Sequence, residues 1–398
     1  MMTTRYMRLI DKVIGTPVCI ILAMLFRILH QFIPVSAPYP ANEVKRILCI
    51  KFFGAGSILL ATPLFAGLKR KYPHAKLMLI TFDSNMEFAA EIKYIDEIYP
   101  FRKKNIMLFL YDFFYHAWFF WRNRVDISID LEFFAKTPII LALTYLSRFR
   151  IGLHSKTSFC NELLSKTVIF NPDHHISEMF FELGQVVGIE YDDSFFKIKL
   201  PSYRELYTHN ILPRLQLVNG QKYILINTNS SDLCSYRRWP QGHVATLIDQ
   251  LAQKYPSKKI VLTGEPDEEK QITQLFALVA NTNIDIINMA GKTTCKELLG
   301  LIEHADIMIS NDSGPAHFSA AFETPLVVLF GPETPTLYRP LNSNMEVIYL
   351  GCDCSPCMNI YDNKDFSQCL KNHCMIDIDV NTVLGAVEKL YASTGSGV

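Results

Sequence analysis

Five consecutive residues, Asn311-Asp-Ser-Gly-Pro315, combine side chains and backbone freedom that suit the binding of an anion. Aspartate and serine are favoured at helix starts, and Gly314 would let the backbone approach a ligand closely. A helix beginning at Ser313 or Pro315 would leave its first N–H groups without helical partners, at the positive end of the helix dipole. The stretch therefore predicts an anion pocket, most simply for a diphosphate.

Apolar runs on both sides of this turn would hold it in place. Residues 305–310 predict a buried strand before the turn, residues 316–322 a helix after it, and residues 325–330 a second strand. In a parallel sheet, ligands bind at the carboxyl ends of the strands, where this turn would lie. An ordinary capped helix in an α/β domain would give the same pattern, so both interpretations stay open at this point.

A second glycine-containing turn lies in the first half of the chain. Residues 44–50 predict a strand, Gly54 and Gly56 lie in the turn after it, residues 58–72 have a helical pattern, and residues 76–81 predict the next strand. This is the opening unit of a doubly wound domain. The turn lacks a third glycine, and no acid closes the second strand, so a dehydrogenase-like enzyme is the weaker hypothesis.

Two carboxylates mark the end of another predicted strand, at residues 125–131. Asp130 and Glu132 stand where side chains leave the carboxyl edge of a sheet, and there they could act as a general base or bind hydroxyl groups. Simple solvation of a strand end is the alternative.

Alternating strands and helices occur in two series, which predicts an α/β protein with two Rossmann-like doubly wound domains. We expect a membrane-associating segment and linker at residues 1–40, an N-terminal acceptor domain at 41–205, a linker at 206–221 and a C-terminal donor domain at 222–398. The ligand turns of both domains are expected to face one cleft.

The composition narrows the class of protein. The chain has 398 residues, of which 49% are hydrophobic and 20% charged, and its formal net charge is zero. This balance gives no general electrostatic footprint for nucleic acid. A chain this large does not need disulfide bonds for stability, so its ten cysteines indicate a reducing compartment. Cys354, Cys357, Cys369 and Cys374 crowd the C-terminal region, where a structural metal site, reduced structural thiols and redox pairing are the alternatives.

Two segments could contact a membrane. Residues 13–33 are mostly apolar and near the roughly 20 residues of a span, but Arg27 and His30 interrupt them. An interfacial or re-entrant anchor is the favoured prediction, and a spanning helix or a helix packed on the globule are the alternatives. Residues 106–121 are aromatic-rich between basic flanks, which suits either a bilayer interface or a core helix under a sheet.

Several of these motifs together resemble one family, the heptosyltransferase-type glycosyltransferases of family nine, which have the GT-B fold. The strongest matches are Asn311-Asp-Ser-Gly-Pro-Ala-His317 and residues 324–332. Further matches are residues 56–64, Asp130-Leu-Glu132, Arg150-Ile-Gly152, Arg237-Arg-Trp-Pro240, Gly264 with the acids after it, and Cys354-Ser-Pro-Cys357. The resemblance covers about residues 45 to 390. This resemblance does not identify which sugar is transferred.

The resemblance implies an inverting, metal-independent transfer from a nucleotide sugar, commonly ADP-heptose, with no cofactor required. The acceptor would be a lipid-linked glycan such as the lipopolysaccharide core. The enzyme would then work at the cytoplasmic face of the bacterial inner membrane, as a peripheral or monotopic protein on that surface.

The family's site residues carry over onto matching positions. Asp312, Ser313, Gly314 and His317 would hold the donor, with its diphosphate at the helix start. Arg237, with Arg238 as the neighbour in register, stands where the family often has a lysine near the donor phosphates; a solvated loop pair is the alternative. Glu268 or its acidic neighbours, after Gly264, would bind the ribose hydroxyls. Gly54 and Gly56 would form the acceptor-side loop.

One departure concerns catalysis. Many family members have aspartate, the expected general base, where this chain has Ser57. A serine hydroxyl cannot serve unassisted, because its pKa is far above the working pH. Three outcomes stay open: Glu132 or Asp130 supplies the base, the step needs little base assistance, or catalysis has been lost. In the last case the chain would be a nucleotide-sugar or glycan-binding protein of the same fold.

Overall fold

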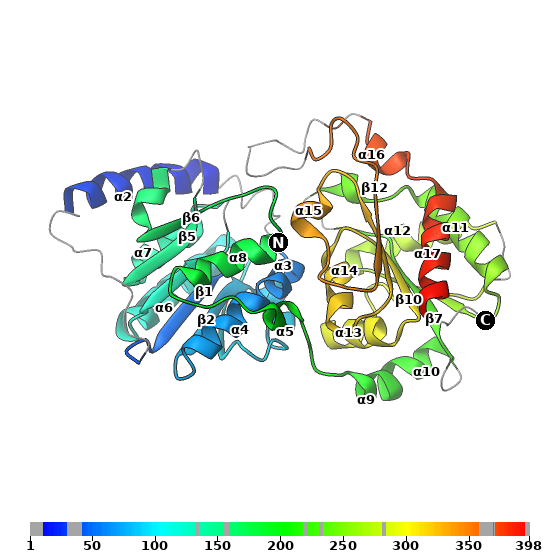
Figure 1. The fold of residues 1–398 in the computed structure, drawn as a ribbon, viewed down its shortest axis with the longest axis horizontal. Helices are drawn as coiled ribbons and strands as arrows, with labels where there is room; N and C mark the ends of the chain where they lie inside the picture. Colours follow the sequence, from blue (N-terminus) through cyan, green and yellow to red (C-terminus); the bar gives the residue numbers. More distant parts are fainter. Residues whose placement is uncertain are drawn as a thin grey trace. The chain divides into compact units, whose positions relative to one another are not determined.

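The structure, a computed structural model, describes residues 11–29, 42–132, 135–154, 159–217, 221–230, 234–280, 284–357, 369 and 371–394. The chain divides into two compact units, residues 1–197 and 198–398. Each unit contains one six-stranded sheet (Figure 1). The two are described separately.

The sheet of the first unit is parallel throughout, with the strand order β3-β2-β1-β4-β5-β6. Its strands are β1 (Arg46–Ile50), β2 (Lys76–Phe82), β3 (Glu97–Phe101), β4 (Ile127–Asp130), β5 (Phe149–His154) and β6 (Lys166–Ile169). The central strands β1 and β4 are buried almost throughout because helices cover both faces of the sheet. This order is that of a Rossmann-like domain, whose ligand turns follow the central strands.

Helices form layers on both faces of this sheet. The long segments are α4 (Thr62–Lys71), α6 (Ile106–Arg122), α7 (Thr137–Thr144) and α8 (Ile176–Gln185). Helices α6 and α7 pack on the face that carries Leu48, Ile50 and Met78, and α4 and α8 pack together on the other face. The short segments are α3 (Ala55–Leu60), η2 (Asp83–Asn85), α5 (Met86–Ala89), η3 (Phe159–Leu163) and η4 (Asp193–Phe196).

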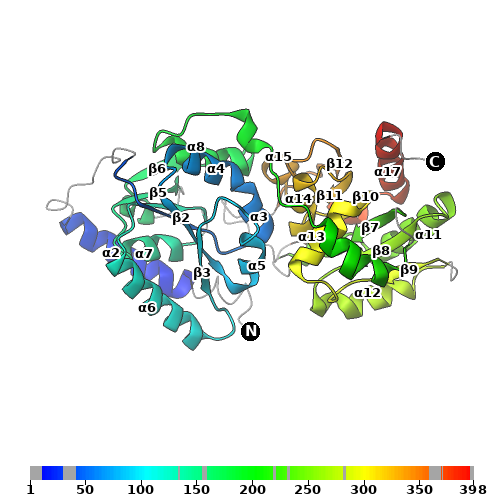
Figure 2. The same cartoon turned by 90° about the horizontal axis from the view of Figure 1, so that it is seen from below.

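The N-terminal apolar segment is helical where the structure describes it. A π-helical turn, η1 (Asp11–Gly15), leads into α2 (Thr16–Leu29), and Cys19 and Ala23 pack on Ile139 of α7. Helices α2, α7 and α6 run side by side (Figure 2). Among the described residues, no helix has the length and hydropathy needed to cross a membrane. The ends of the predicted 1–40 segment lie outside the described residues.

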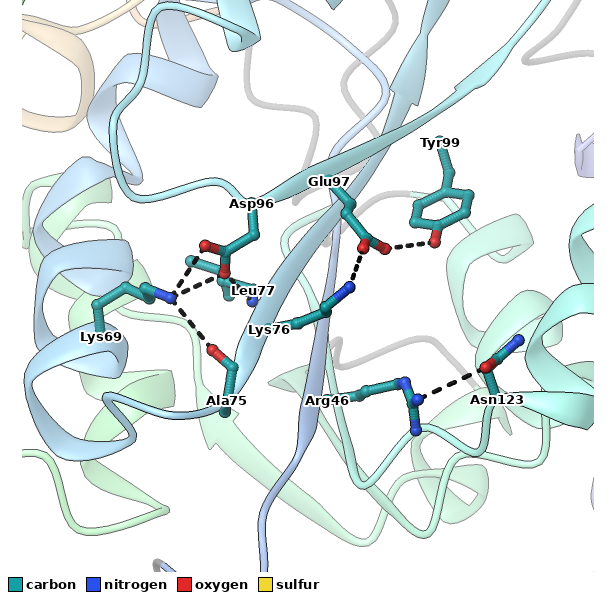
Figure 3. A network of polar contacts seen from close by, with 9 residues as sticks. All are labelled: Arg46, Lys69, Ala75, Lys76, Leu77, Asp96, Glu97, Tyr99 and Asn123. Atoms are coloured by element: carbon teal, nitrogen blue, oxygen red, sulfur yellow. Dashed lines mark hydrogen bonds and ion pairs between the residues drawn. The ribbon is translucent and has the colours of Figure 1, made fainter.

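Polar contacts connect the amino ends of β2 and β3, and Arg46 of β1 separately donates to Asn123 (Figure 3). Lys76 Nζ lies 2.5 Å from Glu97 Oε1, and the hydroxyl of Tyr99 donates to the other oxygen of Glu97 at 2.7 Å. The hydrogen bond from Lys76 holds the pKa of Glu97 below its usual range. These groups lie at the edge opposite the strands' carboxyl ends, so we interpret the network as structural.

The second unit repeats the same topology. Its parallel strands are β7 (Tyr223–Asn227), β8 (Lys259–Thr263), β9 (Ile286–Asn288), β10 (Ile307–Asn311), β11 (Leu326–Phe330) and β12 (Met345–Tyr349), in the order β12-β11-β10-β7-β8-β9. Read from its third strand, this is again the order 3-2-1-4-5-6. The predicted α/β class with two Rossmann-like domains is confirmed.

Helices also cover both faces of the second sheet. One face carries α11 (Gln241–Lys254), α12 (Glu269–Phe276) and α17 (Val380–Thr394), and the other carries α13 (Cys295–His304), whose Leu301 carbonyl accepts a hydrogen bond from Tyr223. The short segments are α9 (Arg204–Leu206), η5 (Tyr207–Ile211), α10 (Leu212–Leu215), η6 (Ser235–Arg237), η7 (Pro266–Glu268), α14 (Gly314–Phe318), η8 (Ser319–Ala321), α15 (Pro335–Tyr338) and α16 (His373–Ile376).

The segment expected to be a linker, residues 206–221, begins with structured turns. Tyr207 stacks on His304 of α13 with ring centroids 4.1 Å apart, and Ile211 and Leu215 are fully buried. The apolar residues recur every four positions, so one face of this helical stretch packs on α13 although its overall composition is polar. Residues 206–215 thus belong to the second unit, whose first residue is Ile198.

Candidate functional site

Amide side chains tie together the carboxyl ends of β7 and β10. Asn227 Nδ2 donates to Ser313 Oγ at 2.8 Å and to Ser310 Oγ at 3.1 Å, and Asn311 Nδ2 donates to the carbonyl of Thr228 at 2.6 Å. All these side chains are buried. Because each bond joins two different strand ends, the turn after β10 is held in one conformation before any ligand arrives.

The helix predicted after this turn begins where expected. Ser313 is the N-cap of α14, Pro315 lies in its first turn, and α14 continues into η8. The Ser313 hydroxyl makes no capping hydrogen bond to the helix and instead accepts the bond from Asn227. His317 is buried on the same short helix.

Arg237 and Asp312 lie against each other at this edge of the sheet. Arg237 Nη1 donates to the backbone carbonyl of Asp312 at 3.1 Å and to its Oδ2 at 3.4 Å. The two side chains are 13% and 6% exposed, so this ion pair is largely shielded from water. Burial raises the pKa of Asp312 above its usual range, and the nearby guanidinium only partly opposes this.

The second predicted arginine turns towards the acid after β8. Arg238 Nη2 donates to the carbonyl of Ser230 at 2.8 Å and lies 3.8 Å from Glu268 Oε1. Glu268 Oε2 accepts from the backbone N–H of Glu265 at 2.8 Å, and burial raises the pKa of Glu268. A Cβ atom on Gly264 would lie 2.8 Å from the same oxygen, so only glycine fits there without displacing Glu268.

Glu333 is a further acid at this edge that the sequence analysis did not single out. It follows the carboxyl end of β11 and is 5% exposed. Burial, and then the neighbouring charge of Asp312, raise its pKa well above the usual range. Its position directly after Gly331-Pro332, at the end of a predicted strand, was the signal that could have identified it.

In the first unit, a buried ion pair lies at the carboxyl ends of β1 and β4. Glu132 Oε1 accepts from Lys51 Nζ at 2.7 Å, from Phe52 N at 2.9 Å and from Phe53 N at 2.7 Å. Glu132 is fully buried, and among the described residues none hydrogen-bonds its other oxygen. Lys51 was also missed, although it directly follows the predicted first strand.

The other predicted residues of this edge lie close in sequence to that pair. Asp130 Oδ1 accepts from the backbone N–H of Glu132 at 2.7 Å, and burial raises the pKa of Asp130 well above its usual range. Gly54 has a φ of +81°, a conformation that favours glycine, and it precedes α3, which contains Gly56 and Ser57. Gly56 is buried and Ser57 is half-buried.

The C-terminal cysteines are free thiols where they are described. Cys354 is exposed and Cys374 is buried. Burial, together with the neighbouring Cys357 and Cys369, raises the pKa of Cys374 to about 12. Within the described residues, no three or more His, Cys, Asp or Glu side chains are arranged to hold a metal ion.

Comparisons with known proteins point to one family. Residues 121–366 match the family described as glycosyltransferase family 9 (heptosyltransferase). The chain is 26% identical to lipopolysaccharide heptosyltransferase 3 of Escherichia coli over 350 residues, which cover 86% of this chain and 98% of that protein.

Solved structures share the fold. ADP-heptose LPS heptosyltransferase II of E. coli has a TM-score of 0.69 at 20% identity, and the match covers 88% of this chain and 99% of that one. A family 9 glycosyltransferase from Veillonella parvula has a TM-score of 0.73 at 20% identity, and the match covers 90% and 100% of the two chains.

Proposed function

Because this chain belongs to glycosyltransferase family 9, the heptosyltransferases, and is a transferase enzyme, we propose that it moves a heptose from ADP-heptose to a lipopolysaccharide core or a similar lipid-linked glycan. The transfer would invert the anomeric carbon and need no metal ion. The enzyme would act as a peripheral protein at the cytoplasmic face of the inner membrane.

The contact between Arg237 and Asp312 is the observation that carries this proposal. It places a guanidinium group, with its five fixed donors, beside the turn that begins α14. Negative charge grows on the nucleotide diphosphate as its bond to the sugar breaks, and a fixed cation stabilises that charge. Arg237 would thus supply within the protein the positive charge that other transferases take from a metal.

The nucleoside would lie towards the carboxyl end of β8. Glu268 is held there by the backbone of Glu265 and faces Arg238 at 3.8 Å. A carboxylate accepts hydrogen bonds from the two vicinal hydroxyls of a ribose. The close approach of Glu268 to Gly264 supports this role, since a side chain at position 264 would displace the carboxylate from its present place.

On the acceptor side, the proposed base is Glu132 or Asp130. The full burial of Glu132 and its bond to Lys51 also suit a supporting role, in which the acid fixes the loop that leads to Gly54 and Ser57. A transfer step that needs little base assistance stays open beside these two.

A second candidate function is nucleotide-sugar binding without transfer. It is favoured by one specific observation, Ser57 at the position where the family often has an acid. The two functions differ in turnover but share donor binding.

The test measures binding and turnover separately. Thermal unfolding with ADP-heptose, ADP and other nucleotide sugars should give stabilisation by mass action, about 2.7 kcal/mol at a hundredfold excess over Kd. Release of ADP with a heptose-deficient lipopolysaccharide core acceptor reports transfer. Stabilisation without ADP release would favour the binding protein, and no stabilisation by any nucleotide sugar would contradict both.

A further inference from the structure

Helix α6 exposes one unusually apolar side. Met107, Tyr111, Phe114, Tyr115, Trp118 and Trp121 are each 48–71% exposed, and we call these six residues the aromatic face. At 3.6 residues per turn they fall within an arc of roughly 120°. The opposite side of the helix buries Asp112, His116, Ala117 and Phe120. From the sequence, residues 106–121 suited either a bilayer interface or a core helix. In the structure the aromatic face suits an interface, and the opposite, buried side packs in the core.

Exposed apolar side chains also occur on α2, which contacts α7, a neighbour of α6. Trp121 Nε1 donates to the carbonyl of Thr144 at the end of α7, and α2 packs on α7 through Cys19 and Ala23. The outward residues Ile21 and Met24 of α2 are 58% and 59% exposed. Helices α6 and α2, which both contact α7, thus each carry exposed apolar side chains. Soluble monomers rarely expose apolar patches of this kind without a partner.

The charges around the aromatic face are positive. Lys104 is exposed just before α6, and Arg122 and Arg124 are exposed at its end. The guanidinium of Arg122 lies 5.0 Å from the ring centroid of Trp118. Asp112 is the acid of this helix, and it is buried against Arg102. The exposed charge of α6 and its flanks therefore complements an anionic surface.

We propose that the aromatic face, with Ile21 and Met24, docks on a bilayer that contains anionic phospholipid. Tyrosine and tryptophan favour the boundary between acyl chains and headgroups, and basic residues at a helix's ends bind anionic headgroups. The inference rests on the proposed function, in that a lipid-linked acceptor is presented at such a surface. Vesicle binding is nevertheless measured without donor, acceptor or turnover.

The test uses the full chain and vesicles of phosphatidylglycerol with phosphatidylethanolamine, compared with phosphatidylcholine alone. Two of the three tryptophans lie on the aromatic face and the third, Trp239, is buried, so intrinsic fluorescence reports docking directly. We expect co-sedimentation with the anionic vesicles and an emission shift to shorter wavelength. Salt should weaken both.

Matched variants locate the surface. Phe114→Ser with Trp118→Ser should lower vesicle partitioning by about tenfold or more, because exposed aromatic area is then no longer buried in lipid. Ile169→Ser with Leu278→Ser removes comparably exposed side chains elsewhere and should bind like the wild type. Far-ultraviolet circular dichroism and a cooperative thermal unfolding transition like those of the wild type check that both double variants are folded, including the first unit, which carries α6.

Three results would overturn the inference. They are wild-type protein that does not bind anionic vesicles, a Phe114/Trp118 variant that binds as well as the control, and a concentration-dependent dimer that buries the same tryptophans without lipid. Vesicle binding by a protein that transfers no sugar would leave this inference standing and contradict the proposed transfer alone.

Discussion

Glu132 and Lys51 form a buried ion pair across 81 positions of sequence, with Glu132 Oε1 2.7 Å from Lys51 Nζ. The same oxygen accepts the backbone N–H groups of Phe52 and Phe53, and Lys51 Nζ donates in turn to the carbonyl of Phe53 at 2.9 Å. One acid thus fixes the first residues of the loop that continues to Gly54. This relationship makes Glu132 the residue whose replacement is most informative.

We expect Glu132→Gln to abolish transfer while ADP binding persists. The variant leaves the Lys51 ammonium buried without its counter-charge, which should cost about 3 kcal/mol or more of unfolding free energy. ADP release measures transfer, calorimetric titration measures ADP binding, and urea unfolding measures stability. Wild-type turnover in this variant would exclude Glu132 both as base and as support for the loop.

A pH profile separates those two roles. If Glu132 is the base, the residual transfer rate of Glu132→Gln should no longer fall at the acidic end of the pH–rate profile. If Glu132 only positions the loop, the residual rate should keep the wild-type profile at a lower level. Asp130→Asn provides the comparison, since Asp130 is the other candidate base on β4.

Arg237→Met should weaken ADP binding by roughly 10- to 100-fold, the range expected for the loss of hydrogen bonds to a charged group. Arg237→Lys should recover only part of that loss, because an ammonium group cannot reproduce the planar fork. Arg238→Met tests the neighbouring arginine, and Arg204→Met serves as the control in α9. If Arg238→Met loses more ADP affinity than Arg237→Met, then Arg238 and not Arg237 is the main phosphate-binding arginine.

Local and long-range features differed in how well the sequence predicted them. The strand, turn and helix around Asp312 were predictable, because apolar runs and turn residues within about 25 positions determine them. The contacts of Lys51 with Glu132 and of Asn227 with Ser313 were not, since each joins residues at least 81 positions apart through the sheet order.

Burial was the other missing information. Glu132 was expected at an accessible strand end, but the loop that begins with Phe52 and Phe53 covers it. In residues 206–215 the polar composition hid three apolar residues at a spacing of four, Tyr207, Ile211 and Leu215. Only the packed structure shows which polar segments have one buried side.

Glu333 should make the stability of the protein depend on pH. Burial raises its folded-state pKa well above the usual range, so the native state holds this proton more tightly than the unfolded chain, whose glutamate pKa is about 4.3. The free energy of unfolding should therefore fall as pH rises from the unfolded pKa through the folded pKa. Glu333→Gln stays neutral and should remove this contribution.

Urea unfolding at pH 5 and pH 8 checks this. We expect Glu333→Gln to be more stable than the wild type at pH 8 and close to it at pH 5, whereas Glu323→Gln, at an exposed position, should follow the wild type at both. Because an ionised Glu333 would also repel a diphosphate, the wild type should bind ADP more tightly at lower pH and Glu333→Gln should lose that trend. Equal pH dependence in all three proteins would contradict the assignment.

Asp11 joins the N-terminal helix to α7, and its loss should loosen that attachment. Its Oδ1 accepts from Lys136 N at 3.0 Å, from Thr137 N at 2.9 Å and from Thr137 Oγ1 at 2.7 Å, so it satisfies the first N–H groups of a helix 125 positions away. Asp11→Ala should cost about 1 kcal/mol, as for the loss of an N-cap, and should speed hydrogen exchange at Lys136 and Thr137. Asp11→Asn keeps an acceptor and should change both quantities less. If asparagine and alanine behave alike, the carboxylate oxygen does not act as the cap of α7.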